Sequence, residues 1–146
     1  MSDHQQNKAL VLEYFNALDA ATADTVGAVL QRYAHQDCQF FGSYPFNELQ
    51  GLAEIATGFW APLYTAFGSL QRRQDIFIAG TSEIEGDQWV MSMGHFMGLF
   101  DTDWLGIRAT RKMVMLRYAV FNCIADGKIN KTGMFLVIIG LMQQVG

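Results

Sequence analysis

Residues Val90–Gly106 read VMSMGHFMGLFDTDWLG and place one histidine, His95, in a run of methionines, phenylalanines and glycines. A strand over 88–100 alternates its side chains, which puts His95 on one face with a tryptophan and three methionines. The other face then carries Val90, Ser92, Gly94, Phe96 and Gly98. Such a histidine is either a hydrogen-bonded core residue or an acid–base group in an apolar pocket, since an unperturbed imidazole titrates near neutral pH. Both interpretations stay open at this point.

The rest of the second half also has the pattern of strands. We expect them near residues 71–80, 88–100, 110–125 and 128–140. Glu85-Gly86-Asp87 separates the first two, and Asp126-Gly127 predicts a tight hairpin between the last two. Strands of this length must twist to cover a core, so we expect a strongly curved antiparallel sheet.

The first half has helical spacing. Apolar residues at 11, 14, 15 and 18 predict a helix over about 5–20, and Asp24 is a suitable N-cap for a second helix. A third helix is predicted from about Leu49 towards Phe67, with a kink or break near Ala61 because Pro62 has no backbone N–H. Helices followed by an antiparallel sheet indicate an α+β fold, and residues 1–146 are predicted to form one domain.

The composition points to a partner or a cavity. Hydrophobic residues make up 51% of the 146 residues. A domain of this size buries roughly two thirds of its unfolded surface, so some of that apolar material stays exposed. We therefore expect a homodimer with an apolar pocket that takes a hydrophobic small molecule.

Several function classes are excluded by the sequence. A formal net charge of −4 argues against a nucleic-acid partner, whose phosphates require clustered Lys and Arg. The longest apolar run, Met134–Met142, is too short to span a bilayer, and MSDHQQNK lacks the apolar segment of a signal peptide. Only two cysteines are present and no metal-ligand or phosphate-loop motif occurs, so we expect a cytoplasmic protein without cofactor or metal.

The order of motifs resembles a known family. A helical start precedes GHFMGLFDTDWLGI (94–107), MLRYAVF (115–121), ADGKI (125–129) and IIGLMQQVG (138–146). This arrangement is similar to the SnoaL-like polyketide cyclases of the nuclear transport factor 2-like superfamily. The resemblance implies a cone in which the curved sheet wraps around the helices and encloses an apolar pocket, and it implies dimers. It also implies intramolecular aldol chemistry by a carboxylate on the last strand, with no cofactor.

The sequence departs from the family at the positions that carry this chemistry. Met134 stands where the cyclase acid would lie, and Val137 stands where many relatives also have an aspartate. Val120 occupies a position where relatives commonly have a glutamate or histidine. None of these three side chains can transfer a proton, so the usual family mechanism has no support here.

Candidate site residues follow from these patterns. His95, with Asp101 or Asp103 in the following turn, is the candidate acid–base set. Aspartates in turns also commonly cap loops, so that alternative stays open. The candidate ligand-binding residues are the aromatic and apolar side chains Tyr14, Tyr44, Phe59, Trp60, Tyr64, Trp104, Met113, Val120, Met134 and Val137.

Three functions are compatible with the sequence. The first is a binding protein for hydrophobic or aromatic carbonyl compounds that lacks the family's catalytic carboxylates. The second is a cofactor-independent cyclase or isomerase that uses His95 with Asp101 or Asp103. The third is a non-catalytic dimeric assembly module.

Overall fold

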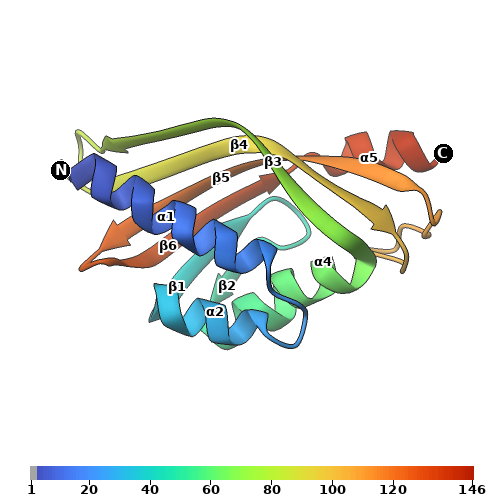
Figure 1. The fold of residues 1–146 in the computed structure, drawn as a ribbon, viewed down its shortest axis with the longest axis horizontal. Coiled ribbons are helices and arrows are strands. Elements are labelled where there is room, and N and C mark those ends of the chain that lie inside the picture. Colours follow the sequence, from blue (N-terminus) through green and yellow to red (C-terminus); the bar gives the residue numbers. More distant parts are fainter. Residues whose placement is uncertain (1–2) are drawn as a thin grey trace.

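The computed structural model describes residues 3–146, as five α-helices, one π-helical segment and six strands within that range (Figure 1). The helical elements are α1 (Asp3–Asp19), α2 (Val26–Tyr33), α3 (Leu52–Ile55), η1 (Ala56–Trp60), α4 (Ala61–Ala66) and α5 (Ile138–Val145). The strands are β1 (Ala34–Gly42), β2 (Glu48–Gln50), β3 (Phe67–Thr81), β4 (Gln88–Phe100), β5 (Met113–Ala125) and β6 (Lys128–Leu136).

All six strands form one curved sheet in the order β2-β1-β6-β5-β4-β3. The helices α1, α2 and α4 lie on its concave side, and α5 lies beyond the end of β6 (Figure 1). The prediction of a cone-shaped α+β fold is confirmed. The sheet is mixed rather than wholly antiparallel, because β1 runs parallel to β6 while the other pairs are antiparallel. The three helical segments after β2 connect this edge of the sheet to β3 at the opposite edge. Strand β1 is therefore free to pair with β6, the last strand.

The third predicted helix is continuous but changes its type. Residues Ala56–Trp60 form a π-helix, and α4 begins at Ala61 with Pro62 in its first turn. Proline is accepted there because the first N–H groups of a helix have no intrahelical partner. At the position near Ala61 where a kink or break was predicted, the hydrogen bonds change from the π-helical to the α-helical pattern. At the second helix, Thr25 rather than Asp24 is the N-cap.

The C-terminal segment differs from the predicted strand over 128–140. Strand β6 ends at Leu136 and the chain turns into α5. Residues 113–117 of β5, which precede Tyr118, have no strand partner on the side of β6. The Val137 N–H donates to the Arg117 carbonyl at 3.0 Å, and the Gln144 side-chain amide exchanges two hydrogen bonds with the Met115 backbone, at 2.7 and 2.9 Å. Gln144 thus satisfies the Met115 backbone groups at an exposed edge of the sheet.

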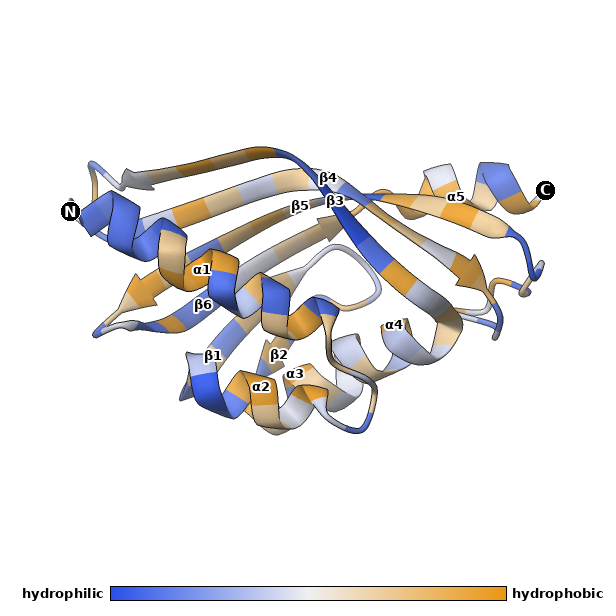
Figure 2. Ribbon diagram, viewed as in Figure 1, coloured by the Kyte–Doolittle hydropathy of each residue, from blue (hydrophilic) through white to orange (hydrophobic). Residues whose placement is uncertain are grey.

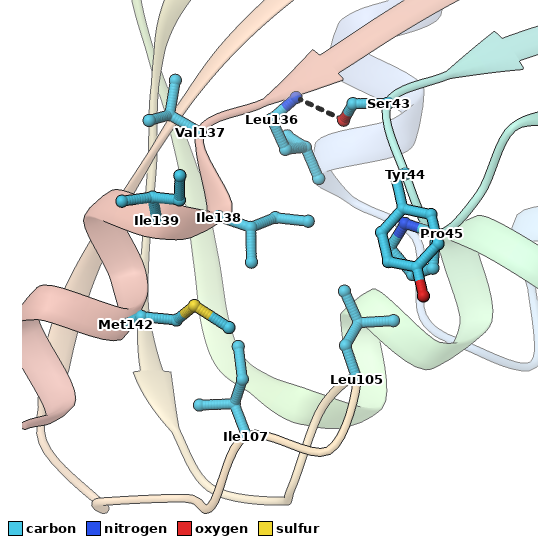
Figure 3. A pocket seen from close by; sticks show the side chains of 10 residues that line it. All are labelled: Ser43, Tyr44, Pro45, Leu105, Ile107, Leu136, Val137, Ile138, Ile139 and Met142. Atoms are coloured by element: carbon cyan, nitrogen blue, oxygen red, sulfur yellow. Dashed lines mark hydrogen bonds between the residues drawn. The ribbon is translucent and has the colours of Figure 1, made fainter.

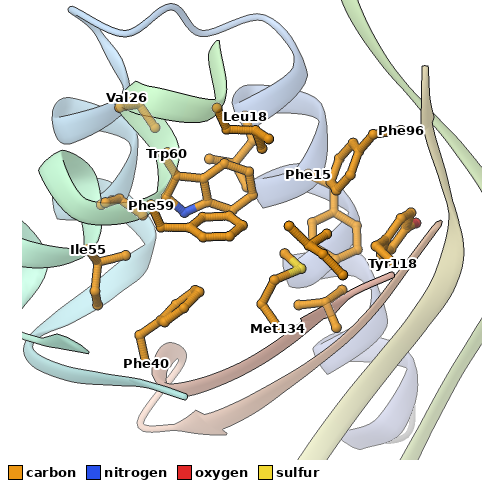
Figure 4. Close-up of a cluster of buried hydrophobic side chains, with 14 of the residues drawn as sticks. Phe15, Leu18, Val26, Phe40, Ile55, Phe59, Trp60, Phe96, Tyr118 and Met134 are labelled. Carbon is orange, nitrogen blue, oxygen red and sulfur yellow. The ribbon is translucent and has the colours of Figure 1, made fainter. Parts of the chain in front are cut away.

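The concave face of the sheet is filled by aromatic and aliphatic side chains (Figure 4). Phe59 is fully buried, with ring centroids 4.8 Å from Phe40 and 4.9 Å from both Phe46 and Trp60. Figure 2 shows one hydrophilic stretch in the middle of β3, between more hydrophobic ends. That stretch is Gln71–Asp75, and it passes over the same core.

Candidate ligand-binding site

An apolar cavity of about 780 Å³ lies between α5 and two loops (Figure 3). Its walls come from the β1–β2 loop, the loop after β4 and the junction of β6 with α5. The lining residues are Ser43, Tyr44, Pro45, Leu105, Ile107, Leu136, Val137, Ile138, Ile139 and Met142. Leu136 and Ile107 are buried members of the core, so the cavity has the core as its floor. This volume suits a drug-sized molecule.

The first loop is fixed to β6 by hydrogen bonds. The Ser43 N–H donates to the Met134 carbonyl at 3.3 Å, and the Ser43 hydroxyl accepts the Leu136 N–H at 3.4 Å. These bonds hold Tyr44 and Pro45 opposite α5, as Figure 3 shows. The Tyr44 side chain is 82% exposed, which leaves its hydroxyl available at the rim.

No Asp, Glu, His, Lys, Arg or Cys side chain is among the residues that line this cavity. Its polar side-chain groups are the hydroxyls of Ser43 and Tyr44. An apolar wall with one or two oriented polar groups binds a hydrophobic compound and directs a single polar substituent. It offers no group that would exchange a proton at neutral pH.

The structure places His95 on the convex face of the sheet. Its side chain is 21% exposed, and its Nδ1 lies 3.4 Å from Asp75 Oδ2. The neighbouring core-facing position is Gly94, where an added Cβ would collide with the Arg73 carbonyl on β3. His95 also lines a smaller cavity of about 340 Å³ against α5, together with Val137 and Gln144. The histidine therefore stands outside the cone, beside an aspartate.

Asp101 and Asp103 lie in the loop after β4, away from His95. The strand advances about 3.4 Å per residue, so six residues separate His95 from Asp101 by roughly 20 Å. One carboxylate oxygen of Asp103 accepts the Ala109 N–H at 2.7 Å and thereby shapes its own loop. Asp103 also lines a cavity of about 470 Å³ that includes Trp104. The structure does not bring the three predicted acid–base residues together.

The ten predicted ligand-binding residues lie in four different environments. Tyr44 and Val137 line the large cavity, and Met113 is 60% exposed near the start of β5. Tyr64 is partly buried, and its hydroxyl donates to the Leu18 carbonyl at 2.6 Å. The others are buried within the core, namely Tyr14, Phe59, Trp60, Trp104, Val120 and Met134.

Sequence reasoning missed most of the cavity's residues. Leu105, Ile107 and Met142 are outside the predicted ligand-binding set, and Ile138 and Ile139 fall within the strand expected over 128–140. The helical signal was present, because the apolar residues 138, 141, 142 and 145 recur at helical spacing.

A cluster of polar side chains lies inside the cone and is not among the predicted site residues. Arg72 Nε is 3.3 Å from Asp19 Oδ1, and the Arg72 side chain is only 4% exposed. The Ser92 hydroxyl donates to Gln74 Oε1 at 2.8 Å and is bonded to the Tyr118 hydroxyl at 2.8 Å. Burial raises the pKa of Asp19, and the nearby Arg72 opposes that shift. Burial also raises the pKa values of Tyr14 and Tyr64 well above the usual range.

Within residues 3–146, no three His, Cys, Asp or Glu side chains gather as a metal site would require. None of the helices in the described part of the chain has the length and apolar character to cross a membrane.

Solved structures share this fold over nearly the whole chain. A protein from Jannaschia sp. CCS1, provisionally named a SnoaL-like polyketide cyclase, is 21% identical with a TM-score of 0.80, covering 99% of this chain and 95% of its own. AclR of Streptomyces galilaeus, provisionally named a hydroxylase, is 16% identical with a TM-score of 0.76, covering 99% and 98%. A provisional polyketide cyclase from Xanthomonas campestris is 18% identical with a TM-score of 0.75, covering 99% and 100%.

No protein-family model matches the chain, and no curated protein does. The resemblance inferred from the sequence is confirmed as a likeness of fold: the chain folds as structures named SnoaL-like polyketide cyclases do. Neighbours with this fold carry names of different activities, a cyclase and a hydroxylase, so the activity has to be argued from the site.

Proposed function

We propose that this chain is a binding protein for a hydrophobic or aromatic, carbonyl-bearing small molecule, held between α5 and the Tyr44–Pro45 loop. The observation that carries the proposal is the 780 Å³ cavity, whose lining is apolar apart from two hydroxyls. Tyr44 and Val137, both predicted from the sequence to contact ligand, lie in that lining. The Tyr44 hydroxyl at the rim is the group that would receive the ligand's polar end.

Binding without catalysis is favoured by the residues at the family's chemical positions. Val120 and Met134 face each other across β5 and β6, and both are buried. Neither side chain can act as an acid or base. The alternative acid–base set requires His95 to act with Asp101 or Asp103, and the strand holds these residues far apart. The geometry therefore supports a binding role over a cyclase or isomerase role.

The test is a ligand screen with a matched pair of variants. Hydrophobic ring ketones are screened by thermal shift on the parent, and the dissociation constants of the hits are then measured for Ile139→Glu and Ile84→Glu. Ile139 lines the cavity and is 68% exposed, whereas Ile84 is 94% exposed in the β3–β4 turn. A ligand at a hundredfold excess over its dissociation constant stabilises the fold by about 2.7 kcal/mol.

We expect Ile139→Glu to lose binding while Ile84→Glu keeps it, because a carboxylate in the wall is unpaired against an apolar ligand. Equal affinities in the two variants would exclude this cavity as the site.

The same chain is proposed to form a homodimer through the convex face of the sheet. Large apolar side chains are exposed there without cover from the described residues, among them Ile76, Ile78, Met93, Met115 and Phe135. Large apolar side chains exposed on one face of a sheet are typical of an interaction site. The proposed compartment is the cytoplasm, where the free, buried thiols of Cys38 and Cys123 would stay reduced.

A further inference from the structure

A row of basic side chains crosses the convex face of the sheet. Arg73 of β3, His95 of β4 and Arg117 of β5 lie directly opposite one another in the pairing of these strands. Adjacent strands are about 4.8 Å apart, so the three side chains are neighbours. Asp75 stands beside the row, with Oδ2 3.4 Å from His95 Nδ1. Two guanidinium groups against one carboxylate leave a local positive charge on a chain whose formal net charge is −4.

A cavity of about 340 Å³ lies between this row and α5. Its volume is at the lower end of the range of pockets that hold small molecules. Of the five side chains named above for the dimer surface, Met115 alone lines it. The lining combines two basic side chains with a mainly apolar wall, namely His95, Met115, Arg117, Val137, Gly140 and Gln144.

Hydrogen bonds fix the walls of this cavity. The Val137 N–H donates to the Arg117 carbonyl at 3.0 Å. The Gln144 side-chain amide donates to the carbonyls of Met115 and Gly140, at 2.7 and 3.1 Å. Its oxygen accepts the Met115 N–H at 2.9 Å. Because both ends of this amide are engaged, Gln144 serves as a wall, and polar recognition of a ligand falls to His95 and Arg117.

The Arg117 side chain is available to an anion. The ion pairs among residues 3–146 join Arg72 to Asp19 and His95 to Asp75, so Arg117 has no carboxylate partner in that range. A guanidinium presents its N–H groups as a planar fork that matches the two oxygens of a carboxylate. Arg117 is therefore a suitable anchor for a ligand that carries one.

Asp75 favours one side of the basic row for such a ligand. A second cavity, of about 220 Å³, also touches His95 and Arg117, and Asp75 is in its wall. A carboxylate there would be repelled by Asp75. No Asp or Glu side chain is among the residues that line the 340 Å³ cavity. An anion is thus directed to the cavity against α5.

We propose that the cavity between Arg117 and α5 binds a small monocarboxylate with an apolar body. Arg117 binds the carboxylate, and the His95 ring adds a second donor when it is protonated. Met115 and Val137 contact the apolar part, and Gly140 leaves room for it because it has no side chain. This site is distinct from the cavity proposed for the carbonyl compound, with which it shares only Val137.

The experiment titrates phenylacetate, phenylacetamide and acetate into the protein and follows the backbone amides by ¹H–¹⁵N NMR. Phenylacetate should bind at least about tenfold more tightly than phenylacetamide, which has the same shape without the charge. It should also bind more tightly than acetate, which has no ring to bury. The signals of Val137 and Gly140 should shift with phenylacetate.

Three variants test the site. Arg117→Met should remove the preference for the acid over the amide. Arg73→Met, which removes the neighbouring arginine outside the cavity, should keep most of it. Gly140→Leu should abolish phenylacetate binding by filling the cavity. An added Cβ at Gly140 meets Val137 Cγ1 at 3.6 Å, an ordinary contact, so α5 accepts the new side chain.

Equal affinities for phenylacetate and phenylacetamide would overturn the proposal, and so would phenylacetate binding that survives Gly140→Leu. Unchanged Val137 and Gly140 signals at millimolar phenylacetate would do the same. An equal loss in Arg117→Met and Arg73→Met would assign binding to the general charge of the face and not to the cavity. Neither Arg117 nor Gly140 lines the cavity proposed for ring ketones, so ketone binding should persist in both variants and the two proposals fail separately.

Discussion

Placing a carboxylate at position 134 should destabilise the protein strongly. Met134 is 1% exposed and lies between Gly42 of β1 and Val120 of β5, deep in the filled cone. Met134→Asp removes packing and buries an ionisable group. Truncating a buried methionine to alanine costs about 2–5 kcal/mol. Protonating an aspartate of ordinary pKa so that it can stay buried at pH 7 costs about 4 kcal/mol more.

Met134→Ala is the control that isolates the charge, because it leaves a similar cavity without the carboxyl group. We expect Met134→Asp to be about 4 kcal/mol less stable than Met134→Ala at pH 7, and only about 1.5 kcal/mol less stable at pH 5. The sign follows from a folded-state pKa that is raised: the folded protein holds the proton more tightly, so stability falls as the pH rises. Urea unfolding of both variants at the two pH values measures the difference.

Equal stability of the two variants at both pH values would refute this reasoning. The carboxylate would then be solvated, and the interior of the cone would contain water rather than packed side chains. The ligand site would in that case have to be sought inside the cone, where the resemblance to the cyclases places it.

Three further outcomes are expected. Burial raises the pKa of Cys38 to about 11, so the unfolded chain loses this proton first; stability should fall between about pH 9 and 11, and less so in Cys38→Ala, by chemical denaturation. Met93→Glu should shift the protein towards monomer in sedimentation analysis, while Ile84→Glu should not; a dimer unchanged by Met93→Glu would argue against the convex face. Gln144→Leu should cost about 1 kcal/mol of stability by releasing the Met115 backbone, whereas Gln143→Leu should cost little, as urea unfolding would show.

The sequence predicted the bounds of some strands well. It did not predict which face of a strand points into the core. Alternation and turn residues placed β4 at its observed bounds, Gln88–Phe100. They could not tell which face points inward, because the methionine-rich face and the Val90–Phe96 face are both apolar. The uncovered convex surface of the sheet therefore made His95 look like an interior residue.

Long-range pairing decided the elements that were missed. Strand β1 has no clear alternation of polar and apolar residues, and its partner β6 lies near the other end of the chain. Helix α5 replaces a predicted strand because Gln144 satisfies the free edge of β5. Arg72 and Arg73 are adjacent residues of the same type, so the local sequence does not show which of them is buried. The pairing of β3 with β4 decides it, because Arg72 lies opposite Phe96 and Arg73 lies opposite His95.

The parallel pairing of β1 with β6 also has a consequence for synthesis of the protein. Ala34 meets Ile129, and Phe40 meets Thr132, so β1 cannot complete its ladder until almost the whole chain has left the ribosome. At about 5–20 residues per second, that delay lasts several seconds. During this time one edge of β1 has no partner strand, and the apolar side chains that later meet under the sheet are exposed. A nascent chain of this protein is therefore a substrate for chaperones that bind extended, hydrophobic segments until the last strand arrives.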